Sequence, residues 1–193
     1  MRKLISLCLV AVMLVAAAGM AFAQDTPDLP GVAPAGQNPS NAIQVDVGYL
    51  ISGLMGGGFG IGGGYEFALS DNFTGKVMGG FVTWSWFDTT WSFIDIYGQA
   101  RYYIWPTAVN GLYVGAGAGV TIFDYSIGSL VWPGIIADVG YKFTLADDGR
   151  GGFFLEPYLG FQALLGTGGT GDDVWLTPGY GGLRYGLGLG WTF

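Results

Sequence analysis

Nine ionisable side chains occupy positions that alternate with large apolar residues, so a strand would turn them to the opposite face from those residues. Charges withdrawn from water must pair, because an isolated buried charge is very costly. We therefore predict an internal ion-pair network. It would act as a structural plug, as the gate of a narrow conduit or in an unrelated role. Its members are Asp46, Glu66, Lys76, Asp95, Arg101, Asp138, Lys142, Glu156 and Arg184.

The residue types limit catalysis. The chain contains no histidine, which excludes Ser–His and Cys–His nucleophilic pairs and His-ligated metals. The glycine-rich segments 56–58 and 62–64 lack the Gly-Lys-Ser/Thr continuation of a phosphate-binding loop. Buried carboxylates are more often ion-pair partners than general acids. We predict no catalytic residues, no cofactor and no metal site, and hence a protein that is not an enzyme.

The elements that position these charges are strands, as the last eleven residues show most clearly. One face of this segment is large and apolar, and the other carries one arginine, three glycines and a threonine. This pattern is typical of a strand in a transmembrane β-barrel. The apolar face consists of Leu183, Tyr185, Leu187, Leu189, Trp191 and Phe193.

Eight such segments are separated by short turns rich in Asp, Asn, Pro and Gly. They lie at about 43–52, 59–69, 73–87, 94–104, 112–122, 131–143, 153–165 and 183–193. Charged residues make up 11% of the chain, against roughly 25% in soluble domains. After residue 23, the chain has no apolar run long enough for a spanning helix. We predict an all-β fold, an eight-stranded antiparallel up-and-down transmembrane β-barrel. A soluble lipocalin-like barrel would instead have an apolar interior.

Several local features of this barrel can be predicted. The third segment loses its alternation near Val82, which suggests a bulge or the membrane edge, and Pro133 suggests a local break in its strand. Inward glycines would either make room for long side chains or leave a cavity for a small ligand. Two aromatic girdles are expected. The outer girdle comprises Trp84, Trp86, Trp91 and Tyr125, and the one near the termini includes Phe73, Tyr102, Tyr141, Phe143 and Phe153.

The first 41 residues precede the barrel. Arg2 and Lys3, an apolar run and a small-x-small pattern ending at Ala23 predict a secretory signal peptide over 1–23, cleaved before Gln24. We predict that residues 24–41 form a Pro-rich periplasmic tail and that the barrel spans 42–193. The net charge of the whole chain is −7, and it becomes more negative after cleavage. Nucleic acid is therefore excluded as a partner.

The signal peptide, the segment from Tyr65 to Phe73 and the C-terminal strand resemble those of small eight-stranded outer-membrane barrels of the OmpA/OmpX/OmpW type. The C-terminal Gly188, Trp191 and Phe193 are similar to the signal that barrel-assembly machinery recognises in such proteins, although Leu187 departs from its usual polar residue. The resemblance implies insertion into outer-membrane lipid of a diderm bacterium. Barrel enzymes of this size use a catalytic histidine, which this chain lacks.

From these observations we expect a structural or surface-exposed outer-membrane protein with a largely plugged lumen. The alternative is a narrow channel, or a carrier for small apolar solutes, which the glycine-lined sector of the wall suggests. An external ligand is also compatible with either reading.

Overall fold

The structure is a computed structural model that describes residues 39–86, 89–104, 109–125, 128–145, 151–165 and 182–193. The predicted signal peptide, its cleavage site at Ala23 and Gln24, and most of the Pro-rich tail lie outside these residues. Within the described residues, no helix has both the length and the apolar character needed to cross a membrane.

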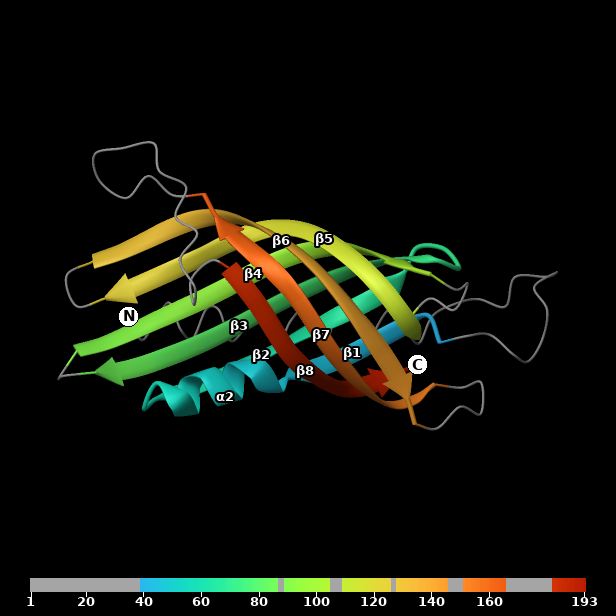
Figure 1. Ribbon diagram of the computed structural model, residues 1–193, viewed down its shortest axis with the longest axis horizontal. Helices are drawn as coiled ribbons and strands as arrows, with labels where there is room; N and C mark the ends of the chain where they lie inside the picture. Colours follow the sequence, from blue (N-terminus) through green and yellow to red (C-terminus); the bar gives the residue numbers. More distant parts are fainter. Residues whose placement is uncertain (1–38, 87–88, 105–108, 126–127, 146–150, 166–181) are drawn as a thin grey trace. The chain divides into compact units, whose positions relative to one another are not determined.

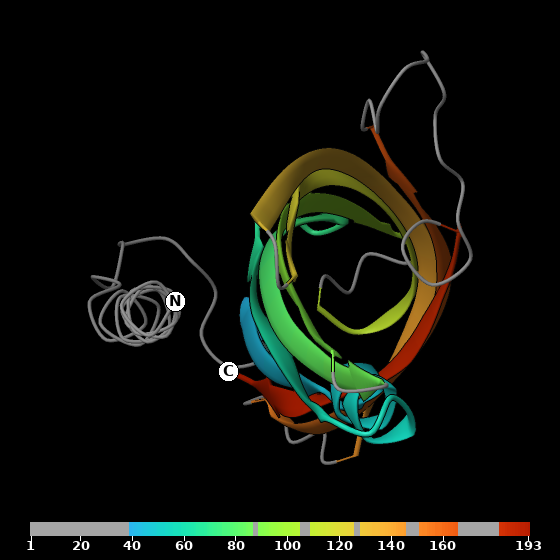
Figure 2. The same cartoon turned by 90° about the vertical axis from the view of Figure 1, so that its left-hand side faces the viewer.

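Eight antiparallel strands form a closed barrel in which each strand pairs with the next along the chain (Figures 1 and 2). The barrel closes by pairing of the first strand with the last, from Ala42 opposite Thr192 to Asp46 opposite Gly188. The predicted up-and-down topology is confirmed. The strands are β1 (Asn41–Asp46), β2 (Phe59–Ala68), β3 (Phe73–Trp86), β4 (Thr89–Tyr103), β5 (Gly111–Tyr125), β6 (Gly128–Thr144), β7 (Gly152–Leu164) and β8 (Gly182–Thr192).

The period-two alternation of the sequence sets the interior and the exterior of the barrel. In β6, Ile135 and Val139 are exposed, whereas Asp138 and Lys142 are buried. The exposed face is apolar and the buried face is ionic, the reverse of the arrangement in a soluble barrel.

The first strand is shorter than predicted, and this expectation was wrong. β1 ends at Asp46, and a helix, α2 (Val47–Met55), follows. Asp46 caps this helix, since its Oδ1 accepts from the Gly48 N–H at 2.8 Å. The ring of Tyr49 occupies the inner face beside Gly62 and Gly80, where an added Cβ would lie 2.3 and 2.1 Å from the ring. The helix thus turns inward a side chain that a strand would have directed to the outside.

Helix α2 contacts β2, β3 and β8 and takes the place that a longer β1 would have between β2 and β8 (Figure 1). Trp84 of β3 fixes it further by donating its Nε1–H to the Ser52 carbonyl at 2.9 Å. The other side of the helix is apolar and exposed. It carries Leu50, Ile51, Leu54 and Met55.

Strands β4 to β6 are longer than predicted, and β3 is more regular than predicted. β3 keeps one continuous register with β4 from Phe73 to Trp86, so the suggested bulge is absent from the described part of this pair. Asp124 and Ser129, which fall between the predicted segments 112–122 and 131–143, pair across β5 and β6. β6 also continues through Pro133, whose carbonyl accepts from the Leu165 N–H at 2.7 Å. The nitrogen of Pro133, which carries no hydrogen, faces the same side, where the pairing with β7 ends at Gly134. The proline therefore costs the strand little hydrogen bonding.

Candidate functional site

Five charged side chains inside the barrel form a bonded group, which we call the ion-pair cluster. Each comes from a different strand, because each occupies an inward position in its own alternation. All five are at most 3% exposed. The members are Glu66 of β2, Lys76 of β3, Arg101 of β4, Lys142 of β6 and Glu156 of β7.

Arg101 lies at the centre of the cluster. Its Nη1 is 3.0 Å from Glu66 Oε2, and its Nη2 is 3.0 Å from Glu156 Oε1. Lys142 also bridges both carboxylates, at 2.5 Å from Glu66 Oε2 and 3.3 Å from Glu156 Oε2. Lys76 completes the cluster with a 3.1 Å contact to Glu156 Oε1. The pairs join strands on opposite sides of the barrel, so the cluster crosses the lumen.

Neutral hydroxyl groups supply further hydrogen bonds to one oxygen of each carboxylate. Glu66 Oε1 accepts from Thr74 at 2.6 Å and from Tyr103 at 2.8 Å. Glu156 Oε1 accepts from Tyr113 at 3.1 Å. The sequence analysis did not single out these three donors. All of them nevertheless occupy the alternate positions of their strands that face the interior, which we call the inward parity.

Aromatic rings cover the cations of the cluster. The guanidinium carbon of Arg101 lies 4.0 Å from the centroid of the Tyr113 ring. Lys142 Nζ lies 4.6 Å from the centroid of Phe154. Such contacts stabilise a cation that has lost its water. The cluster is therefore a desolvated assembly of three bases and two acids within a shell of rings and hydroxyls.

The other four residues of the predicted network do not join the cluster. Asp46, Asp95, Asp138 and Arg184 form no ion pair with any residue in the part of the chain that the structure describes. For these four, the predicted ion pairing is not seen among the described residues. The alternation along each strand correctly predicted that these side chains face the interior. An ion pair also requires a partner of opposite charge at the same level along the barrel axis.

Hydroxyl donors take the place of cations at two of these aspartates. Tyr158 donates to Asp46 Oδ2 at 2.6 Å. Asp95 accepts from Tyr49 at 2.9 Å on Oδ2 and from Thr121 at 2.5 Å on Oδ1. Tyr49 was predicted to face outward, and it could be placed here only with knowledge of α2.

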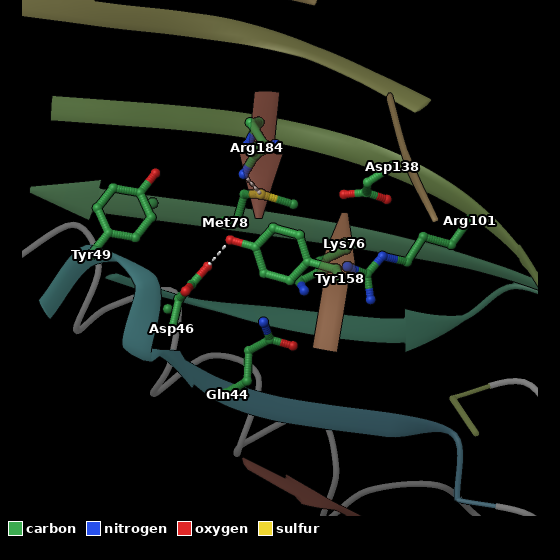
Figure 3. Close-up of a pocket in the computed structure, with 11 residues that line it drawn as sticks. Gln44, Asp46, Tyr49, Lys76, Met78, Arg101, Asp138, Tyr158 and Arg184 are labelled. Carbon is green, nitrogen blue, oxygen red and sulfur yellow. Dashed lines mark hydrogen bonds between the residues drawn. The ribbon is translucent and has the colours of Figure 1, made fainter. Parts of the chain in front are cut away.

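Arg184 and Asp138 line a small cavity next to the cluster (Figure 3). Arg184 Nη2 has a long contact of 3.7 Å to Met78 Sδ. Arg184 Nη1 and Asp138 Oδ1 are buried without a hydrogen-bond partner among the described residues. The volume open to the centre of a water molecule is about 10 Å³, room for roughly one water. This region can hold water but, in this conformation, no larger solute.

The inward glycines make room for rings that cross the lumen. A Cβ at Gly140 would lie 2.4 Å from Tyr113 Oη, one at Gly186 would lie 2.5 Å from Tyr158 Oη, and one at Gly190 would lie 2.6 Å from Phe154 Cζ. These close approaches favour packing over a cavity as the reason for the glycines.

The structure also places the residues of the predicted assembly signal. Gly188 faces inward between Asp46 and Glu156, its partners on β1 and β7. Trp191 faces outward and is 53% exposed. Phe193 follows β8 and its N–H donates to the Asn41 carbonyl at 2.9 Å. Among the residues described, no group of His, Cys, Asp or Glu has the arrangement of a metal site.

Two girdle residues are on the other face from the one predicted. Trp84 and Trp91 are directly opposite each other on β3 and β4, and both share the parity of inward residues on their strands. The side chains of Trp86 and Tyr125 lie outside the described residues. The girdle near the termini agrees better with the prediction, since Phe73, Tyr102 and Phe143 are all exposed.

Comparisons with known proteins give one structural similarity. No family model matches the sequence, and no curated protein matches it. Among solved structures, the chain is similar to the N-terminal beta-barrel domain of Pseudomonas aeruginosa OprF, with 18% identity and a TM-score of 0.45. The match covers 82% of this chain and 99% of the other. The assignment of the fold rests on the strand pairing of this chain itself.

Proposed function

We propose that this chain is a non-enzymatic outer-membrane barrel, structural or surface-exposed, whose lumen the ion-pair cluster closes. The observation that carries the proposal is the polarity of the wall. Ionised side chains are buried inside it, and large apolar side chains are exposed outside it. Water offers no stable environment for that outer surface, because contiguous apolar patches of this kind lead to aggregation.

The exposed apolar side chains extend around the barrel. Ile61 of β2, Ile96 of β4 and Leu159 of β7 are each about half exposed, at 52%, 45% and 51%. A closed barrel also satisfies its backbone hydrogen bonds within the wall, which a bilayer requires. Lipid contact is therefore the role that we assign to this surface.

Aromatic pairs support a membrane interface near the termini. The rings of Phe73 and Tyr102 are 5.1 Å apart, and those of Tyr141 and Phe143 are 4.2 Å apart. Amphipathic and aromatic rings favour the headgroup region. We assign this end to the periplasmic side, and we propose that Gly188, Trp191 and Phe193 are recognised there by barrel-assembly machinery after export by the signal peptide.

The ion-pair cluster supports a closed lumen. It joins β2, β4 and β7 through Arg101 and the two glutamates, and rings from Tyr103, Tyr113 and Phe154 are fully buried around it. An eight-stranded barrel has an interior that side chains can fill. Conduction of hydrated ions would require these contacts to separate.

Planar-bilayer recording of the refolded protein tests this proposal. We expect no stable conductance from the native chain and a measurable conductance from Arg101→Ala, which removes the side chain that joins both glutamates. Tyr102→Ala is the matched control, because this neighbouring residue faces outward, and it should leave the bilayer silent. A stable conductance of the native chain that grows in proportion to salt concentration would overturn the closed lumen.

The alternative is a narrow channel or a carrier of small solutes. The observation in its favour is the cavity beside Arg184 and Asp138, where buried polar atoms have no hydrogen-bond partner in the described part of the chain. Liposome swelling with small sugars and uptake of a fluorescent apolar probe separate the two. Swelling above that of empty liposomes supports a channel, whereas probe uptake without swelling supports a carrier.

A further inference from the structure

The polarity of the wall reverses at the end of β3 to β6 that lies away from the termini. One outward row, Phe81–Ile94–Ile122–Val131, is fully apolar, and the residues are directly paired. The next outward row, Thr83–Ser92–Asp124–Ser129, is fully polar and is paired in the same way. On each of the four strands the outer face changes from apolar to polar within two residues. This change marks the level at which the outer surface leaves the apolar part of the proposed membrane.

The inward face at this level is apolar. Residues that are directly opposite on antiparallel strands share a face, and the inward row is Val82–Phe93–Phe123–Leu130. Phe93 is two positions from the inward Asp95, and Phe123 is two positions from the inward Thr121. The four strands therefore have polar residues outside and apolar residues inside, as in a soluble ligand-binding barrel.

Five aromatic side chains on this inward face form what we call the aromatic band: Trp84, Trp91, Phe93, Phe123 and Trp132. The centroids of Phe93 and Phe123 are 4.6 Å apart and those of Phe123 and Trp132 are 5.9 Å apart, both pairs stacked. Trp84 contacts Phe93 at 5.5 Å, and Trp91 meets Phe123 edge-on at 5.9 Å. The rings thus form one continuous surface across β3 to β6.

Part of this surface is accessible. Trp91 is 40% exposed and the neighbouring Leu130 is 39% exposed. β3 to β6 extend past the end of β7 and the start of β8 (Figure 1). If the proposed membrane placement holds, this end is in water outside the cell, and the inference rests on that placement. Aromatic side chains are common in the lining of ligand sites, and Trp91 offers an exposed one here.

The charge directly below the aromatic band is negative. Asp95 is two residues from Phe93 on β4, and its hydrogen bonds come from the neutral hydroxyls of Tyr49 and Thr121. No basic side chain of the described residues lies within ion-pair distance of it. Asp46 and Asp138 line the cavity deeper in the lumen, and among its described lining residues Arg184 is the one base that does not belong to the ion-pair cluster. The arrangement is complementary to a cation.

We propose that the aromatic band is a binding site for an organic cation with a flat apolar body, such as an aromatic amine. The apolar body packs against the exposed Trp91 and the neighbouring Leu130, and the ammonium group points toward Asp95. Ring faces attract cations, and the attraction strengthens when water is excluded. The site is distinct from the ion-pair cluster and does not require passage through the lumen.

Isothermal titration of the detergent-solubilised full barrel with three probes of the same ring system tests the proposal. Tryptamine is cationic, tryptophol is neutral and indole-3-propionate is anionic. We expect tryptamine to bind about tenfold more tightly than tryptophol, the factor for a cation–π contact combined with an opposing carboxylate. Indole-3-propionate should bind most weakly. Equal affinities for the three probes, or no binding of any, would overturn the proposal.

Four variants assign the effect to residues, each first shown by circular dichroism to retain its strand content. Asp95→Asn should reduce tryptamine affinity to that of tryptophol, and its control Asp71→Asn, on an exposed turn, should not. Trp91→Leu should weaken both probes several-fold, and its control Phe153→Leu, an outward aromatic near the termini, should not. Unchanged binding in both Asp95→Asn and Trp91→Leu would overturn the proposal even if the barrel inserts into lipid as proposed.

Discussion

Burial inside the barrel makes each carboxylate depend on the donors around it. Glu66 is 1% exposed and accepts from Thr74, Tyr103, Arg101 and Lys142. Desolvation of such a group is offset only when all of these contacts form together. A carboxylate in this setting is a structural element rather than an acid or base available to a substrate.

Tyr103→Phe tests this dependence with the loss of one oxygen atom. The variant removes the 2.8 Å hydrogen bond to Glu66 and keeps the ring, so we expect a loss of about 1.5–3 kcal/mol, the range for a bond to a charged group. Tyr102→Phe is the matched control. It is the adjacent residue on β4 and is exposed on the outer face, so its change should be near zero. Urea unfolding in lipid vesicles measures both, and equal effects of the two variants would refute the assigned role of the Tyr103 hydroxyl.

At the scale of elements, the strands could be predicted and the helix could not. A strand with one face in lipid keeps a period of two that can be read from the chain alone. Val47, Tyr49 and Ile51 continue the alternation of β1 and therefore predicted a longer strand. The helix forms because Gly62 and Gly80, on other strands, leave space for the Tyr49 ring. That space is a tertiary property that local periodicity does not contain.

Gly62→Ala tests whether this space holds α2 in place. The new Cβ would lie 2.3 Å from Tyr49 Cδ2, so the ring must move away from Asp95. We expect a loss of about 1–3 kcal/mol, as in other overpacked sites, and faster amide exchange in α2. Gly98→Ala on β4 is the control, because nothing lies within 4 Å of its added Cβ. Unchanged exchange of the α2 amides in Gly62→Ala would show that the ring does not hold the helix.

The whole molecule is divided into levels along the barrel axis. The ion-pair cluster lies toward the termini, the aspartates and Arg184 lie above it, and the aromatic band lies at the opposite end. Parity along each strand predicted which charges face inward, but not this sorting by depth. Depth depends on how far each strand is offset from its neighbour, and the sequence of a single strand does not specify the offset. Trp84 and Trp91 were predicted for a lipid-facing girdle for a different reason: the alternation is unclear near Val82, and Trp91 precedes the predicted start of the fourth segment.

The outward polar row predicts where a charge is tolerated on the outer face. Leu187→Arg places a charge on β8 opposite Pro157, within the apolar part of the wall, and should cost about 2–4 kcal/mol in lipid vesicles. Ser85→Arg places the same charge on the outer face of β3, beyond the polar row that contains Thr83, and should cost about 0–1 kcal/mol. Both variants place the same charge on the outer face and differ only in their depth in the wall. Any effect of arginine that does not depend on depth therefore applies to both. Equal costs for the two would contradict the membrane boundary, and a negligible cost of Leu187→Arg would contradict lipid contact of the outer face itself.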